Sequence, residues 1–108
     1  MSNRRVVVTG IGAITPIGNN LKDYWSSLTE GKSGAGPITL FDASNFKTKF
    51  ACEVKNFNPN DFIDRKQARK LDRFCQFAVV VADQAFSDSG LSVDKINGDR
   101  AGVIWGSG

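Results

Sequence analysis

The chain has 108 residues, a net charge of +3, 41% hydrophobic residues and eight Phe, which is typical of one folded domain or part of one. It contains no His, which excludes a Ser-His-Asp triad, a His metal ligand and imidazole acid–base catalysis. The two cysteines, Cys52 and Cys75, form no CxxC pair of the kind found in zinc or thioredoxin-type redox sites. We therefore expect neither a metal site nor a bound cofactor.

No apolar run approaches the roughly 20 residues that a membrane helix requires. The N-terminal sequence MSNRRVVVTG also lacks an apolar region of signal-peptide length. We predict a cytoplasmic protein with both thiols reduced and no membrane partner.

The first predicted elements are a strand, a loop and a helix. The continuous apolar run at residues 6–9 predicts a strand buried on both faces, and Gly10 ends it. A glycine-rich loop follows. A helix is predicted over Leu21–Glu30, with Asn19 or Asn20 as its N-cap and Gly31 after its end.

Three further elements complete the predicted order. Alternation at residues 50–54 predicts a short strand, and apolar residues spaced three and four apart predict a long buried helix over residues 66–89. Residues 101–105 form a second buried-type strand. The order strand, helix, strand, helix, strand favours an α/β fold with a largely parallel sheet. A core strand so close to the last residue suggests one incomplete domain, with the missing part C-terminal.

The loop after the first strand raises the possibility of nucleotide binding. Glycine-rich loops at a helix N-terminus can hold a pyrophosphate, and Gly10 and Gly12 begin such a pattern. The G-x-G-x-x-G motif requires glycine at position 15, which is Thr15, and no P-loop lysine follows. The alternative is a tight turn in which the glycines permit positive φ and close packing.

The positive charge is concentrated in residues 65–73, where five basic residues and one acidic residue give +4. Such a local patch differs from the broad basic face of a nucleic-acid-binding protein. On one continuous helix, Lys66, Arg69, Lys70 and Arg73 would share a face at its N-terminal end, where cations are unfavourable. A docked acidic partner would explain this arrangement, and a solvated face is the alternative.

Five sequence blocks, in order along the whole chain, resemble the N-terminal part of β-ketoacyl-acyl-carrier-protein synthases, and most closely the elongating type II enzymes of bacterial fatty acid synthesis. The blocks are RVVVTGIGAITPIGN, FDASNFKTKFACEVKNFN, IDRKQARKLDRFCQFA, DSGL and GVIWGSG. The resemblance implies a thiolase-like fold, truncated on its C-terminal side. It also implies decarboxylative condensation of an acyl-enzyme thioester with a malonyl thioester on acyl carrier protein, by a homodimeric enzyme.

The resemblance places no catalytic residue in this chain. The family's nucleophilic Cys and two His match positions beyond Gly108, and neither Cys52 nor Cys75 corresponds to that Cys. Lys66, Arg69 and Lys70 match positions that receive the acidic carrier protein, and Gly106, Ser107 and Gly108 lie next to the acyl pocket. The competing hypothesis is a complete small nucleotide-binding or interaction module.

Overall fold

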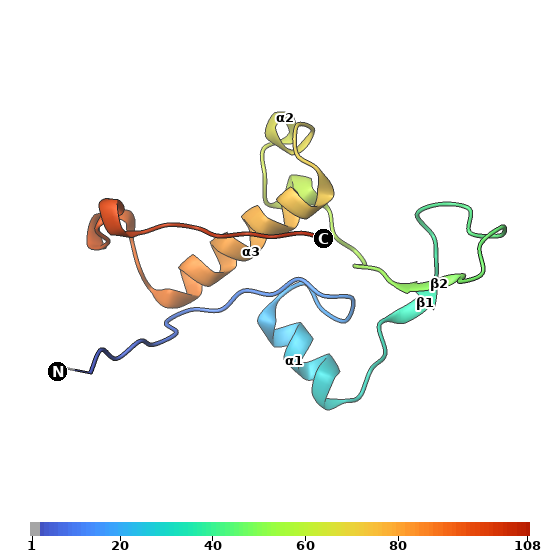
Figure 1. The fold of residues 1–108 in the computed structure, drawn as a ribbon, viewed down its shortest axis with the longest axis horizontal. Coiled ribbons are helices and arrows are strands. Elements are labelled where there is room, and N and C mark those ends of the chain that lie inside the picture. The colour runs from blue at the N-terminus through green and yellow to red at the C-terminus, as the bar shows by residue number, and fades with distance from the viewer. Residues whose placement is uncertain (1–2) are drawn as a thin grey trace.

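A computed structural model describes residues 3–108 and contains three helices, one hairpin and three short 3₁₀ turns (Figure 1). The elements are α1 (Leu21–Thr29), β1 (Ala35–Pro37), β2 (Phe50–Cys52), η1 (Pro59–Asp61), α2 (Arg65–Ala68), α3 (Arg73–Ser89), η2 (Val93–Lys95) and η3 (Gly98–Arg100).

Helix α1 forms close to where the sequence predicts it. The Asn20 side chain accepts a hydrogen bond from the backbone N–H of Asp23 at 2.8 Å, which satisfies a donor that the first helical turn leaves unpaired. Gly31 follows the helix with φ of +71°, a left-handed conformation that glycine adopts without strain. The predicted cap at Asn20 and stop at Gly31 are confirmed.

The strands β1 and β2 form an antiparallel hairpin in which Ala35 pairs with Cys52. This confirms the predicted strand at residues 50–54 for its first three positions. The hairpin is the only sheet within residues 3–108, so the predicted parallel sheet is wrong for the described part of the chain. Figure 1 shows the hairpin and its loop on the opposite side of the molecule from the N-terminal segment.

The predicted strands at residues 6–9 and 101–105 are also absent. Both segments are extended but unpaired, and Val6 and Ile104 are 94% and 99% exposed. A strand needs a neighbour to receive its backbone hydrogen bonds, and residues 3–108 supply none for either segment. The observed element order therefore differs from strand, helix, strand, helix, strand.

The predicted helix over residues 66–89 is divided in two. Asp72 adopts an extended conformation with ψ of 158° and separates α2 from α3. The Gln76 side chain crosses the break, because its Nε2 donates to the backbone oxygens of Ala68 and Leu71 at 3.0 and 3.3 Å. Helix α3 is also less buried than predicted, since Val80 is its only fully buried residue.

The core is small and lies where α3 meets the segment before α2. Phe57, Ile63, Ala68 and Val80 form the buried cluster. The Phe57 ring packs edge-on against Phe77 at a centroid distance of 5.0 Å.

The molecule is more open than a compact domain of its size. Its radius of gyration is 17.4 Å, whereas a compact 108-residue domain has about 13 Å. Its accessible surface is 9016 Å², whereas a folded monomer of 11.7 kDa exposes about 5,900 Å². Much of the apolar surface that the sequence predicts to be core is therefore exposed.

Candidate functional site

An aspartate stands at the N-cap position of each of the two helices of the basic segment, and only Asp64 forms a side-chain capping hydrogen bond. The Asp64 carboxylate accepts hydrogen bonds from the backbone N–H groups of Lys66 and Gln67 and begins α2, and Asp72 precedes α3. The spacing of Asp64 and Gln67 is that of a capping box. The sequence alone therefore carries a signal for the start of α2 at Asp64.

Lys66, Arg69 and Lys70 remain together on one exposed turn, and we call them the basic stripe. The turn continues beyond α2 because the Arg69 N–H donates to the Arg65 oxygen at 3.3 Å and the Lys70 N–H donates to the Gln67 oxygen at 3.0 Å. Arg69 and Lys70 therefore follow the C-terminal end of α2, where cations are favourable. The predicted unfavourable position of these two charges at a helix N-terminus is wrong.

Arg73 does not belong to the stripe. It lies in the first turn of α3, and its guanidinium carbon is 5.4 Å from the Phe57 ring centroid and 5.2 Å from that of Phe77. A cation over an aromatic face is attracted by the ring quadrupole. Arg73 therefore packs against the aromatic core, and the predicted face of four basic residues is reduced to three.

The glycine-rich loop packs against α3. The Ile11 N–H donates to the Asp88 carboxylate at 2.9 Å, and the Ala13 N–H donates to the Gln84 side chain at 3.0 Å. A Cβ at Gly12 would lie 2.3 Å from the Val81 backbone oxygen. The backbone N–H groups of Ile11 and Ala13 are thus already hydrogen-bonded, and one of their partners is a carboxylate. The loop therefore does not form a phosphate-binding site. Close packing of the glycines is confirmed, whereas positive φ at Gly10 and Gly12 is not found.

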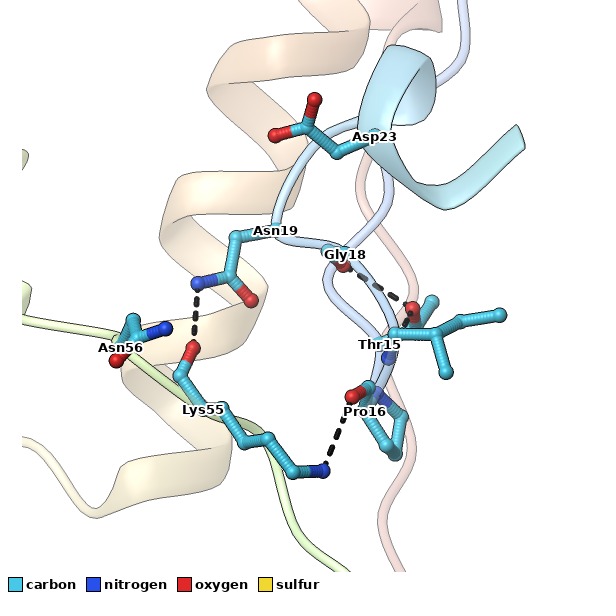
Figure 2. A pocket seen from close by; sticks show the side chains of 8 residues that line it. Thr15, Pro16, Gly18, Asn19, Asp23, Lys55 and Asn56 are labelled. Atoms are coloured by element: carbon cyan, nitrogen blue, oxygen red, sulfur yellow. Dashed lines mark hydrogen bonds between the residues drawn. The ribbon is translucent and has the colours of Figure 1, made fainter. Parts of the chain in front are cut away.

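A cavity of about 320 Å³ lies between this loop and the chain after β2 (Figure 2). The Lys55 ammonium donates to the backbone oxygens of Pro16, Gly34 and Glu53 at 3.2, 2.9 and 3.1 Å. In Figure 2 the Asn19 amide points to the Lys55 backbone oxygen, to which it donates at 2.8 Å. The Lys55 ammonium therefore joins the glycine-rich loop to the hairpin.

The remaining predicted residues are the last three of the chain and the two cysteines, and they do not form a defined site. Gly106, Ser107 and Gly108 are exposed and lie outside any helix or strand. Cys52 is exposed and Cys75 is partly buried, and both are free thiols. Within residues 3–108, no helix is both long and apolar enough to cross a membrane, and no group of acidic or Cys residues could hold a metal ion.

Comparison with known proteins identifies the family. The family described as "Beta-ketoacyl synthase, N-terminal domain" matches residues 3–108. The chain belongs to the β-ketoacyl synthase family. Relatives include 3-oxoacyl-acyl-carrier-protein synthase 2 from Synechocystis sp., 53% identical over the whole chain, and that from Coxiella burnetii, 51% identical. This chain spans 26% of the length of each.

A solved structure supports the same assignment. The ishigamide ketosynthase/chain length factor matches 88% of this chain and 24% of its own chain, with a TM-score of 0.80 and 41% identity. The described residues are therefore arranged as in a ketosynthase, which has the thiolase-like α/β fold predicted from the sequence. Family membership overturns the alternative of a small nucleotide-binding module.

Proposed function

We propose that residues 1–108 form the N-terminal part of a β-ketoacyl-acyl-carrier-protein synthase of fatty acid elongation. The observation that carries this proposal is 53% identity over the entire chain to a 3-oxoacyl-acyl-carrier-protein synthase 2. The complete enzyme would transfer an acyl group to its own Cys. Loss of carbon dioxide from malonyl-carrier protein would leave a two-carbon carbanion still attached to the carrier. This carbanion would attack the acyl-Cys thioester, so that the new carbon–carbon bond forms, the carbon–sulfur bond to Cys breaks and the lengthened acyl group stays on the carrier.

In this proposal the chain supplies a scaffold and a docking surface, and no catalytic group. The sequence has no His to stabilise an enolate or a thioester oxyanion. Neither Cys52 nor Cys75 has an imidazole partner, and neither matches the family's nucleophile. We place the complete enzyme in the cytoplasm as a homodimer, and Gly106–Gly108 beside its acyl pocket. The large exposed apolar surface of this chain supports association with further polypeptide.

The basic stripe is the proposed landing surface for the acidic carrier protein. Lys66, Arg69 and Lys70 are all exposed, and no carboxylate within residues 3–108 pairs with them. Complementary charges at an accessible surface speed encounter and fix orientation. Three such pairs at about 0.5–1 kcal/mol each would change affinity on the order of tenfold to a hundredfold.

The test replaces all three stripe residues with Glu in the complete synthase. KM for the carrier-bound substrate should rise on the order of tenfold to a hundredfold, and added salt should reproduce the loss in the unchanged enzyme. Self-acylation from a small thioester that lacks the carrier should persist. A control with the same charge change replaces the exposed Lys22, Lys47 and Lys95 with Glu.

The outcomes separate docking from folding. An equal loss with both substrates would show that the stripe is structural. No loss with either substrate would return the stripe to a solvated face. A similar effect from the control would mean that overall charge, and not this surface, guides the carrier.

A further inference from the structure

The turn η3 contains a pair of residues with its own chemistry, Asn97 and Gly98. Of the asparagines in the chain, Asn97 is the only one that is followed by glycine. The backbone nitrogen of the next residue can attack the side-chain carbon of an asparagine and close a five-membered ring. Glycine has no Cβ to obstruct this attack. The pair is therefore the most reactive asparagine position that the sequence offers.

Both residues are open to solvent. Asn97 and Gly98 are exposed, as are residues 99 and 100. A Cβ at Gly98 would meet no atom within 4 Å, so no other part of the described chain packs against that side of the residue. Within residues 3–108, neither the Gly98 N–H nor the Asn97 amide nitrogen donates a hydrogen bond. The attacking nitrogen and the leaving nitrogen are thus both without a protein partner in the described chain.

The turn holds Asn97 in a conformation that must open before the ring can close. The Asn97 side-chain oxygen accepts a hydrogen bond from the Asp99 N–H at 3.1 Å, and its backbone oxygen accepts one from the Arg100 N–H at 2.9 Å. With ψ of 104°, Asn97 must rotate about its Cα–C bond before its side-chain carbon reaches the Gly98 nitrogen. Only the few hydrogen bonds of an exposed turn oppose this rotation, so local opening suffices and global unfolding is not required.

We propose that Asn97 is a site of spontaneous deamidation in the folded protein. The Gly98 nitrogen loses its proton and bonds to the side-chain carbon of Asn97. The bond from that carbon to the amide nitrogen breaks, and the amide group leaves with the proton as ammonia. Water, the only co-reactant, then opens the cyclic imide at one of its two carbonyl carbons, which gives isoaspartate or aspartate. Each product carries one more negative charge than asparagine at neutral pH.

Isoaspartate changes the course of the main chain. Its backbone runs through the former side chain, which inserts the Cβ as one extra atom before Gly98. The hydrogen bond from the Arg100 N–H depends on the normal spacing and is lost. The turn leads directly into residues 101–103, which line an apolar hollow of about 340 Å³ together with Phe86, Leu91 and Ile96. The extra atom therefore displaces the segment that leads to the last three residues of the chain.

The experiment follows residue 97 in the complete synthase, which is kept folded at mildly alkaline pH because the attacking nitrogen must lose its proton. Trypsin cleaves after Lys95 and Arg100, so the short peptide between these cuts reports on this site. Mass spectrometry with chromatographic separation should show the asparagine form giving way to aspartate and isoaspartate forms, with ammonia released in equal amount. In Gly98→Ala, conversion should be lost, and the new Cβ has free space and needs no positive φ. The exposed Asn45, which precedes Phe46, is the control within the same sample and should stay intact.

Three results would overturn the proposal. Equal conversion in Gly98→Ala, or at Asn45, would show that the following glycine confers no preference. Conversion only after denaturation in urea would show that the turn stays closed in the folded protein. An unchanged hydrogen-exchange rate of the Arg100 amide in the isoaspartate form would contradict the displaced turn. Asn97→Gln provides a second variant, because its longer side chain forms a six-membered ring and should release no comparable ammonia.

Discussion

The Glu53 carboxylate organises the loop that joins β1 to β2. It accepts hydrogen bonds from the Thr39 hydroxyl at 2.7 Å and from the Thr39 and Leu40 N–H groups at 3.0 and 3.4 Å. The Thr39 hydroxyl, followed by the Thr39 N–H, holds the pKa of Glu53 below its usual range. The loop therefore depends on an ionised side chain.

This gives the loop a pH dependence of definite sign. Because the folded pKa lies below the unfolded one, the stabilisation is fully present above the unfolded pKa and is lost as the pH falls through the folded pKa. We predict that the backbone amides of Thr39 and Leu40 lose protection from hydrogen exchange when the pH is lowered below about 4. Glu53→Ala should remove that protection at neutral pH, whereas Glu30→Ala should not, because the exposed Glu30 contacts Ser26 and Lys32 and makes no hydrogen bond to Thr39 or Leu40. Unchanged protection in Glu53→Ala would contradict this account.

We predict that the two cysteines take no part in catalysis. Cys52 is exposed on β2 and Cys75 is partly buried on α3, and the chain has no His to activate either. Replacing both with Ala in the complete synthase should leave condensation turnover intact, with a packing cost of about 1 kcal/mol at Cys75. Acyl-enzyme formation followed by mass spectrometry checks this. Loss of the acyl adduct in either single variant would overturn it.

At the scale of elements, the glycine-rich loop packs closely against the backbone of α3. A Cβ at Gly10 would lie 2.2 Å from the Ala85 oxygen, and one at Gly12 would lie 2.3 Å from the Val81 oxygen. Both neighbours are helix backbone, which cannot move aside as a side chain can. The two glycines are therefore required for packing.

We predict that Gly12→Ala destabilises the complete synthase by roughly 1–3 kcal/mol, the usual cost of overpacking. The control is Gly36→Ala, since a Cβ at Gly36 meets no atom within 4 Å. Urea unfolding midpoints of the two variants provide the comparison. Equal midpoints would show that the loop and α3 separate without cost.

The elements that the sequence predicts correctly are those with local signals. Asn20 and Gly31 define α1 through hydrogen bonding and backbone geometry within a few residues. The apolar spacing does not predict the break at Asp72, because that spacing continues across it, although an aspartate favours caps over helix interiors. The strands at residues 6–9 and 101–105 depend on neighbours, so their hydrophobicity predicts burial that the described chain does not provide. For the site, charge and resemblance identify the stripe, whereas the packing of Arg73 against Phe57 and Phe77 depends on the three-dimensional fold.

At the scale of the whole molecule, the exposed surface exceeds that of a compact monomer by about 3,100 Å², relative to the expectation of about 5,900 Å². Obligate interfaces bury about 2,000–5,000 Å² over both partners. The excess on this one chain is therefore larger than the roughly 1,000–2,500 Å² that each partner contributes to such an interface. Much of it is apolar, including Val6, Val8, Val103 and Ile104, each more than 80% exposed.

This surface predicts how the 108-residue chain behaves alone. With only five buried hydrophobic residues within residues 3–108, hydrophobic burial offsets little of the conformational entropy lost on folding, about 1–2 kcal/mol per residue for the backbone alone. We predict no cooperative thermal transition by circular dichroism and no condensation with malonyl-carrier protein. The complete synthase, measured in parallel, should show both. A sharp transition in the monomeric chain would mean that its small core suffices, and turnover above the blank would mean that the chain carries a nucleophile that the sequence does not reveal.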